Sequence, residues 1–435
     1  MDMRWIKNFA ALAKTPAREM ALQLAEVALD AIETRGVIRR AVTVNQNEIK
    51  INDIVIPLET NGRIFVVGVG KCSLEATLEL EAILGERITD GVVIDAERRA
   101  LPRRIRFYLG DHPFPTENNI QATAEIIKLL SQVNQNDLVI FVISGGGSAL
   151  LCQPEKHTCL EEVTAEKILF RHGAPIEKLN IVRKHLSLAR GGYLAKYAYP
   201  ARVVSLIFSD VPGNDIGIIA SGPTVLDTTT VSDSKKVIGE CDNNGECKLI
   251  LERLIETPKE PKYFARVTNV LLLTNETALQ AMADSALTLG LTPTIKNLAL
   301  AGEARAVGAA IAQKISTAPV GSVYLYGGET TVTIRSAGMG KGGRNQELVL
   351  GALPHLSAGE CLLAFASDGV DNSDHAGALC DIITSEQARV ISLNPVVSLD
   401  QNNSYPFFTS VGDYLDTGYT GANVSDIIIA LKIKT

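Results

Sequence analysis

The stretch LVIFVISGGGS, residues 138–148, joins six apolar residues to a turn of three glycines between two serines. A short run that is apolar throughout and bounded by glycine is typical of a strand buried on both faces, as in a parallel sheet. Such glycine turns also follow strands for purely structural reasons, but bare backbone amides between two hydroxyls suit a phosphate group. The stretch therefore predicts a buried strand followed directly by a phosphate-binding loop made of Ser144, Gly145, Gly146, Gly147 and Ser148.

Short aliphatic runs alternate with segments of helical periodicity along the rest of the chain. This alternation is typical of βαβ units and predicts an α/β protein with a mainly parallel sheet. In the first half we expect strands at 64–69, 92–94, 105–109, 138–143 and 203–208, and helices from Thr15 to Gly36 and at 116–130. In the second half we expect strands at 270–273, 323–326 and 362–366, and helices at 277–289 and 303–315.

The length of 435 residues exceeds what one hydrophobic core normally organises, so two domains are expected. Near Thr228 the amino-acid composition changes. The chain there contains three segments rich in turn formers, charge or proline: TTTVSDSKK, CDNNGEC and ETPKEPK. We place the boundary there and predict domains at 1–245 and 246–435.

The composition indicates which classes of partner the protein binds and in which cellular compartment it is found. The net charge of -7 gives no general attraction to nucleic acid or to an anionic membrane, and the 5% aromatic content offers few base-stacking platforms. Seven cysteines without a CxxC pair are typical of reduced thiols, and the chain carries neither a signal-peptide pattern nor a long apolar span. We expect a cytoplasmic protein that binds small molecules and is able to form a homodimer.

Lys71 stands at the carboxyl end of the first expected strand, in the turn GVGKCS. The turn matches neither the Walker spacing nor the GxGxxG fingerprint. A lysine there is commonly just solvated, yet the carboxyl edge of a parallel sheet is where ligands bind. Lys71 is therefore a candidate for a phosphate contact.

A basic segment, LNIVRKHLSLARGGYLA, contains Arg183, Lys184, His185 and Arg190. It reads either as a charged surface helix or as a pocket for a carboxylate or phosphate. His185 fits a structural histidine and is given no catalytic role.

Carboxylates follow strands in both halves of the chain. Asp210 ends the fifth strand in FSDVPGNDIGIIASGPT, where it either caps a turn or accepts a hydroxyl proton, and Asn214 lies close behind it. In the second half, Glu329 follows a strand, Arg344 lies in GMGKGGRNQE, and Asp368 and Asp371 lie in ASDGVDNSDHAGA. Carboxylates together with lysine and arginine suit phosphoryl transfer, which indicates a kinase.

Eight ordered segments resemble the glycerate 2-kinases with a MOFRL-type second domain, a family sometimes labelled hydroxypyruvate reductase. The likeness spans nearly the whole chain and is carried by GVGKCS, GDHPFPTENN, SGGGSALL, LNIVRKHLSLARGG, SDVPGNDIGIIASGPT, GGETTVTI, GKGGRNQE and SDGVDNSDHAGA. It implies a Rossmann-like N-terminal domain that faces a smaller α/β domain across a cleft. It also implies transfer of a phosphoryl group from ATP, with Mg²⁺, to the 2-hydroxyl of D-glycerate.

In this resemblance the catalytic positions are Lys71, Asp210 and Arg344. The expected roles are charge balance by Lys71 and Arg344 and orientation or deprotonation of the hydroxyl by Asp210. The loop 144–148 and Asn214 would hold phosphate or nucleotide. Arg183 and Lys184 would bind the acceptor, and Asp368 and Asp371 would bind the metal.

The chain departs from the family pattern at Leu226, Asn372 and Tyr419, and Asn372 puts a metal role for Asp371 in doubt. Two other functions remain open at this point. An NAD(P)H-dependent hydroxypyruvate reductase is opposed by the absence of a complete dinucleotide fingerprint. A nonenzymatic nucleotide or sugar-phosphate sensor on the same fold has no need to retain Lys71, Asp210 and Arg344 together.

Overall fold

The computed structural model describes residues 4–242, 245–334 and 340–435. The chain divides into two compact units, which we describe separately. The N-terminal unit comprises Thr34–Asp210 and Asn214–Leu273. The C-terminal unit comprises Thr274–Thr435 together with Val211–Gly213 and the chain up to Glu33. In the described part of the chain, no helix has both the length and the apolar character that crossing a membrane requires.

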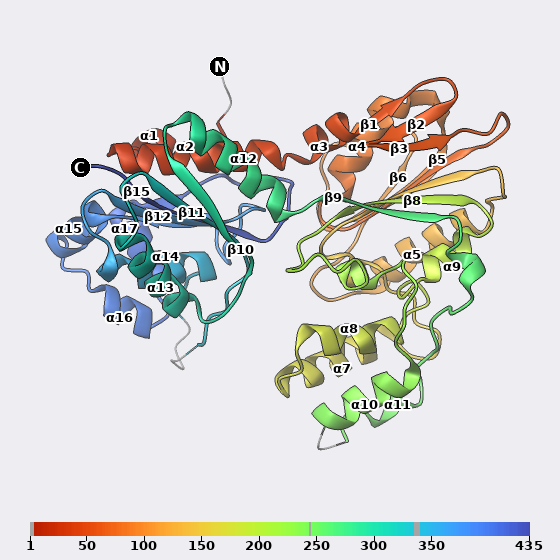
Figure 1. Ribbon diagram of the computed structural model, residues 1–435. Helices are drawn as coiled ribbons and strands as arrows, with labels where there is room; N and C mark the ends of the chain where they lie inside the picture. The colour runs from red at the N-terminus through yellow and green to blue at the C-terminus, as the bar shows by residue number, and fades with distance from the viewer. Residues whose placement is uncertain (1–3, 243–244, 335–339) are drawn as a thin grey trace. The chain divides into compact units, whose positions relative to one another are not determined.

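A six-stranded parallel sheet forms the centre of the N-terminal unit, with the order β6-β5-β4-β7-β8-β9 (Figure 1). Its strands are β4 (Ile64–Val69), β5 (Ile88–Asp95), β6 (Arg106–Leu109), β7 (Leu138–Ile143), β8 (Arg202–Phe208) and β9 (Val267–Leu273). When the strands are numbered in chain order from β4, their order across the sheet is the 3-2-1-4-5-6 of a Rossmann fold. The strand order reverses between β4 and β7, although these two strands run parallel. The Rossmann-like sheet expected from the resemblance is confirmed.

Strands β4 and β7 are buried at every position, as their unbroken apolar sequences predict. They pair in register, from Ile64 opposite Leu138 to Val69 opposite Ile143, so both end at the same level of the sheet. The residues after β4 and after β7 therefore leave the sheet side by side, at the reversal point.

Helices of the N-terminal unit cover the sheet and extend beyond it. They are α3 (Thr34–Ala41), α4 (Ser73–Leu84), α5 (Glu117–Leu130), α6 (Gly147–Leu150), α7 (Cys159–Arg171), α8 (Ile176–Lys184), α9 (Tyr193–Ala198), α10 (Val231–Cys241) and α11 (Lys248–Leu251), with short 3-10 turns η1 (Gly85–Arg87), η2 (Ile219–Ser221) and η3 (Pro261–Tyr263). A separate antiparallel meander consists of β1 (Val42–Val44), β2 (Glu48–Ile51) and β3 (Ile54–Pro57).

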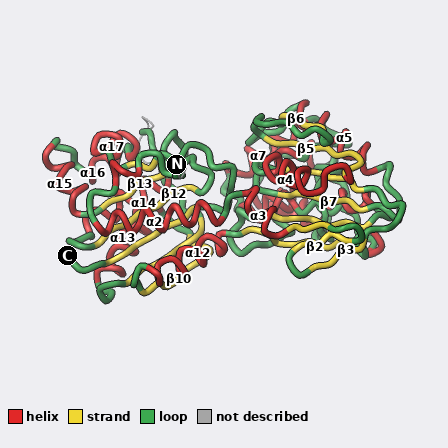
Figure 2. Tube along the Cα trace, turned by 90° about the horizontal axis from the view of Figure 1, so that it is seen from above, coloured by secondary structure: helices red, strands yellow, loops and turns green. Residues whose placement is uncertain are grey.

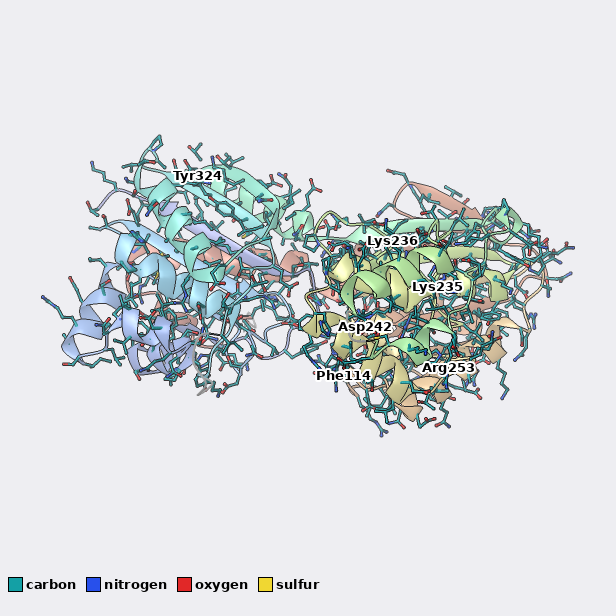
Figure 3. All side chains as sticks on the ribbon, turned by 90° about the horizontal axis from the view of Figure 1, so that it is seen from below. Phe114, Lys235, Lys236, Asp242, Arg253 and Tyr324 are labelled. Carbon is teal, nitrogen blue, oxygen red and sulfur yellow. The ribbon has the colours of Figure 1, made fainter. Side chains whose placement is uncertain are left out.

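Helices α7, α8, α10 and α11 form a group with a hydrophobic core of its own (Figure 1). Arg253, at the end of this group, pairs with Glu161 in the first turn of α7, with 2.8 Å between nitrogen and oxygen. The Lys167 ammonium of α7 lies 4.3 Å from the centre of the Phe114 ring. Arg253 and Phe114 are both labelled in Figure 3. These contacts hold α7 at both its N-terminal end and its middle.

A mixed six-stranded sheet forms the centre of the C-terminal unit, in the order β10-β11-β15-β12-β13-β14. Only β10 and β11 pair in parallel, and the other pairs are antiparallel. The strands are β10 (Thr292–Leu300), β11 (Ser322–Gly328), β12 (Glu360–Ala366), β13 (Gly377–Cys380), β14 (Tyr414–Leu415) and β15 (Asp426–Lys432).

Helices cover both faces of this second sheet. Figures 1 and 2 show α2 and α12 side by side over one face, while α13 and α14 lie on the other face in Figure 1. The helices are α1 (Phe9–Leu12), α2 (Pro16–Ala31), α12 (Asn275–Thr288), α13 (Ala304–Ser316), α14 (Arg344–Ala352), α15 (Ile382–Val390), α16 (Pro395–Asp400) and α17 (Ser404–Val411), with the 3-10 turn η4 (Leu353–His355). The smaller α/β second unit expected from the resemblance is thus a mixed sheet between two helical layers.

A buried charge cluster joins α2 to the strands and loops of the C-terminal unit. The Arg18 guanidinium is fully buried and donates to both Asp381 and Asp413, at 2.6 to 2.9 Å. Thr384 adds a hydroxyl that accepts from Arg18 at 2.9 Å and donates to Asp413 at 2.7 Å. The cluster explains why a helix from the start of the chain belongs to the C-terminal unit.

Two of the differences between the expected and the observed elements concern the helix after Thr15 and the strand at 270–273. The helix that we expected to run from Thr15 to Gly36 ends at Ala31, and Gly36 lies inside α3, where it is buried. The strand expected at 270–273 forms, but it is part of β9, which pairs with β8 and so completes the first sheet. The two units meet in sequence at Leu273 and Thr274, later than the predicted domain boundary at 245 and 246.

Candidate active site

The turn after β4 and the glycine loop after β7 are bound together by their backbones. The Ser144 amide donates to the Val69 carbonyl at 2.9 Å, and the Lys71 amide donates to the Gly145 carbonyl at 3.0 Å. Gly70 has a φ of +126°, and a Cβ there would lie 2.0 Å from the Ser144 Oγ. Glycine at position 70 is therefore required both by the backbone conformation and by the close approach of the loop.

Lys71 and Asp210 lie on either side of the glycine loop. A Cβ built on Gly145 would lie 1.8 Å from the Asp210 Oδ2, and a Cβ built on Gly146 would lie 3.0 Å from the Lys71 Cγ. Asp210 follows β8 and Lys71 follows β4, so both residues reach the loop from strands that neighbour β7. The structure thus brings together the lysine, the aspartate and the loop at one edge of the sheet.

His112 also borders the loop, although we assigned it no role from the sequence. A Cβ at Gly146 would lie 3.2 Å from the His112 Cδ2. His112 is exposed, yet nearby atoms displace part of the water around its ring, and this desolvation together with the charges of Lys71 and Arg183 lowers the pKa of His112 to about 4. His112 is therefore neutral at physiological pH and can both donate and accept a hydrogen bond there. Its one sequence signal is its place in GDHPFPTENN.

The far end of the loop contacts the segment that follows β8. The Ser148 and Ser221 hydroxyl oxygens are 2.9 Å apart, and Ser221 donates to the Asn180 Oδ1 at 2.7 Å. Asn214, predicted to bind phosphate or nucleotide, is half-buried in the same segment and has a φ of +57°. Ser148 is half-buried as well, whereas Ser144 is fully buried and its Oγ accepts from the Cys72 amide at 3.3 Å.

Each cation of the basic segment lies against a carboxylate. Arg183 forms two hydrogen bonds with Glu166, at 2.9 and 2.7 Å, and the Lys184 Nζ lies 3.2 Å from Asp227. Arg190 is buried and lies 2.6 Å from Glu162. The sequence alone does not pair these three acids with the cations, because 17 to 43 positions separate the partners.

His185 is a structural histidine, as expected. It is fully buried, its Nδ1 lies 2.8 Å from the Ile255 carbonyl, and its Nε2 lies 3.2 Å from the Thr229 hydroxyl.

Arg344 is the first residue of α14 in the C-terminal unit, and its guanidinium pairs with one buried carboxylate and one exposed carboxylate. Asp426 is buried and accepts from the Arg344 Nη2 at 2.9 Å, while the exposed Glu329 lies 2.7 Å from Nη1. Burial raises the pKa of Asp426 to about 7, although Arg344 opposes this shift. The Asp426 contact fixes the guanidinium, and the Glu329 contact is the one that an incoming anion can replace.

The structure places the two aspartates predicted to bind metal in different surroundings. Asp371 is buried, and its two carboxylate oxygens accept from the Asn345 amide at 3.1 Å and the Gln346 amide at 2.9 Å. These bonds satisfy the free N–H groups at the start of α14, and they occupy the oxygens that a cation would need. Asp368 accepts from the Val370 amide at 3.0 Å. Within the described ranges, no three His, Cys, Asp or Glu side chains gather as a metal site.

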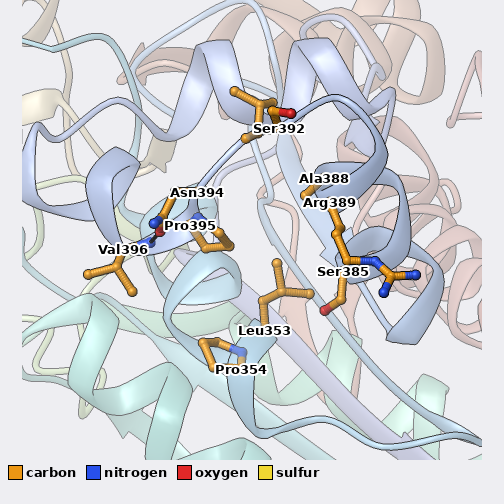
Figure 4. A pocket seen from close by; sticks show the side chains of 10 residues that line it. Leu353, Pro354, Ser385, Ala388, Arg389, Ser392, Asn394, Pro395 and Val396 are labelled. Atoms are coloured by element: carbon orange, nitrogen blue, oxygen red, sulfur yellow. Dashed lines mark hydrogen bonds between the residues drawn. The ribbon is translucent and has the colours of Figure 1, made fainter.

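One pocket lies apart from all these residues, in the C-terminal unit. It has a volume of about 530 Å³ and lies between the η4 turn and helices α15 and α16 (Figure 4). Its lining includes Leu353, Ala388 and Leu393, with Arg389 at one side. None of the predicted site residues lines it.

Comparison with known proteins agrees with the geometry. Residues 20–254 match a family described as a domain of unknown function, DUF4147, and residues 322–426 match the MOFRL family. A glycerate 2-kinase of Pyrococcus horikoshii is 36% identical over 95% of this chain and 97% of its own. The crystal structure of glycerate kinase from Thermotoga maritima superimposes with a TM-score of 0.82 and 31% identity, covering 95% of this chain and 99% of the other.

The chain belongs to the glycerate 2-kinase family with a MOFRL domain. A relative from Agrobacterium vitis named putative hydroxypyruvate reductase is 37% identical over 86% of this chain and 88% of its own, so both names occur in this family. Asn372, one of the departures from the family pattern, has a φ of +52°, a conformation that asparagine tolerates better than most residues.

Proposed function

We propose that the protein transfers the γ-phosphoryl group of ATP to the 2-hydroxyl of D-glycerate, which yields 2-phosphoglycerate and ADP. The observation that carries the proposal is the placement of Lys71 and Asp210 on either side of the glycine loop, where the strand order reverses. The glycerate kinases among its relatives, which match nearly the whole chain, support the choice of acceptor.

In the proposed reaction the loop 144–148 holds phosphate oxygens through its backbone amides. The 2-hydroxyl oxygen attacks the γ-phosphorus, the bond from that phosphorus to the ADP oxygen breaks, and the hydroxyl proton passes to the Asp210 carboxylate. Lys71 balances the negative charge on the group in transfer. The neutral imidazole of His112 can donate to one oxygen of this group without adding to the charge.

Arg344, Asn214, Arg183 and Lys184 complete the proposed set. Arg344 offers the guanidinium edge now held by Glu329 to an anionic oxygen, and Asn214 offers an amide to phosphate. Arg183 is the more exposed of the two acceptor-binding cations and is close enough to His112 to lower its pKa, so it is the direct contact for the glycerate carboxylate.

We propose that Mg²⁺ enters as part of the MgATP co-substrate, because Mg²⁺ in kinase sites keeps several waters and is bound by substrate phosphates together with one or two carboxylates. Asp368 and Asp371 take no part in this proposal. The presence of seven buried free cysteines supports the expected cytoplasmic location.

An assay that offers a phosphoryl donor, ATP, and separately a hydride donor, NADH or NADPH, distinguishes the candidate functions. Purified protein is given MgATP with and without D-glycerate while ADP release is followed, and in parallel it is given hydroxypyruvate with NADH or NADPH. We expect ADP release that depends on D-glycerate and no oxidation of either nicotinamide. Oxidation of NADH or NADPH without ADP release would instead establish the reductase, and neither reaction would favour a sensor.

A further inference from the structure

Two cysteines lie in contact just beyond the glycine loop. The Sγ atoms of Cys152 and Cys159 are 3.0 Å apart, and both residues are free thiols buried in the N-terminal unit. Cys152 follows α6 after one further residue, and Cys159 is the first residue of α7. This dithiol is outside the proposed phosphoryl-transfer chemistry.

The spacing of the sulfurs favours a bond between them over a shared metal. Two thiolates on one tetrahedral zinc stand about 3.8 Å apart, given a zinc–sulfur distance of about 2.3 Å. The observed distance is shorter, and only about 1 Å separates it from a disulfide bond length. Joining the two residues closes a short loop of the chain and requires the sulfurs to approach by about 1 Å.

The surroundings divide the pair into a nucleophile and its partner. The hydrogen bond between the two sulfurs lowers the pKa of Cys159, and the position of Cys159 at the start of the 13-residue α7 favours its thiolate as well. The same hydrogen bond and burial raise the pKa of Cys152. The paired charges of Glu162 and Arg190 lie near both thiols: the Glu162 carboxylate raises the pKa of each thiol, and the Arg190 guanidinium opposes this by lowering it.

We propose that Cys152 and Cys159 form an oxidation site at which a peroxide produces an intrachain disulfide. The Cys159 thiolate attacks one peroxide oxygen, so that the O–O bond breaks and Cys159 becomes a sulfenic acid. The Cys152 sulfur then attacks the Cys159 sulfur and displaces water. Two thiols and one hydrogen peroxide thus give one disulfide and two waters, and a dithiol reductant reverses the change.

The disulfide would tether the carboxyl end of the loop region. The Leu151 carbonyl, next to Cys152, accepts from the Arg190 Nε at 2.8 Å, and the Gln153 amide donates to the Ser187 hydroxyl at 3.1 Å. Cys152 is therefore held on a fixed segment, and the approach of the sulfurs requires movement chiefly at the residues that precede α7.

Peptide mapping tests the proposal without any assay of catalysis, so the result does not depend on the proposed function. Trypsin cuts after Lys156, which places Cys152 in peptide 129–156 and Cys159 in peptide 157–167. The full-length protein is treated with hydrogen peroxide, the remaining thiols are alkylated, and the digest is analysed by mass spectrometry. We expect the two peptides to appear joined and the intact chain to be about 2 Da lighter, with both changes reversed by dithiothreitol.

Three variants complete the experiment. Cys159→Ser and Cys152→Ser should each abolish the joined peptide, while Cys241→Ser, which removes the most exposed of the seven buried thiols, should leave it intact. Wild-type protein in which peroxide only adds oxygen atoms to one cysteine, or joins other cysteines instead, would overturn the proposal. The wild-type map decides the question even where a serine variant folds poorly.

Discussion

Gly145 lies so close to Asp210 that the position has no room for a side chain. A Cβ at residue 145 would stand 1.8 Å from the Asp210 Oδ2 and 2.4 Å from its Cγ. The carboxylate that we propose as proton acceptor is therefore placed directly against the backbone that we propose as the phosphate cradle.

Substitution of Gly145 by alanine should impair the reaction more than the fold. The methyl group displaces the Asp210 carboxylate, and displacement of a reacting group by about 1 Å can cost about a hundredfold in rate. We expect the kcat of Gly145→Ala to fall by about that factor, as measured by ADP release. Gly239→Ala is the matched control, because Gly239 lies in α10 with open space around it and its variant should retain full activity. A Gly145→Ala enzyme with normal kcat would contradict the proposed loop geometry.

Replacement of Asp210 by asparagine removes the proposed proton acceptor and preserves its shape. General base catalysis contributes roughly a hundred- to ten-thousandfold, so kcat should fall within that range while the KM for MgATP changes little. Asp284→Asn, on the exposed side of α12, serves as the control for a lost surface carboxylate. If Asp210→Asn raised KM and left kcat unchanged, Asp210 would instead be a ground-state binding residue.

The pKa of His112 reports the position of Lys71 without catalysis. Burial and the charges of Lys71 and Arg183 hold that pKa near 4, against an ordinary value of 6.5. Lys71→Met removes one of the two charges, so the pKa should rise while staying below 6.5. Imidazole NMR titration of the six histidines measures this shift. Lys235→Met on α10 should leave the His112 titration unchanged, and an equally unchanged titration in Lys71→Met would place Lys71 away from the loop.

Arg18 should be a major source of stability in the C-terminal unit. Arg18→Met leaves Asp381 buried without its cation and leaves Asp413 with Lys14 at 3.1 Å, and breaking a buried pair typically costs about 3 to 5 kcal/mol. We expect the urea transition of this unit to move to clearly lower concentration. Lys7→Met, which removes an exposed partner of Asp416, should hardly move it. Equal transitions for the two variants would contradict the structural role of the Arg18 cluster.

The first sheet could be predicted in detail where a strand is apolar throughout. The bounds expected for β4 and β7 are the observed ones, because both strands are buried on both faces and end at glycine turns. Strand β10 was missed, since it alternates exposed and half-buried residues and carries Pro293, Lys296 and Asn297. The sequence predicts one helix from Thr15 to Gly36 because glycine often ends a helix, but α2 ends at Ala31 and a new helix, α3, begins at Thr34.

The candidate site was predictable only where the sheet itself brings residues together. Lys71, the glycine loop and Asp210 follow adjacent strands, so their meeting could be inferred from strand position alone. The role of Asp371 could not, because the amides that it accepts from begin a helix 25 positions away in the sequence. The same holds for the acids beside Arg183 and Lys184, whose proximity depends on helix packing and not on local pattern.

The position of the new phosphate ester tests the central claim most directly. Wild-type protein is incubated with MgATP and D-glycerate, and the product is identified by phosphorus NMR, with Asp210→Asn run under the same conditions. The account predicts 2-phosphoglycerate from the wild type and a strongly reduced yield of the same product from the variant. Formation of 3-phosphoglycerate, or the absence of any phosphorylated glycerate, would contradict it.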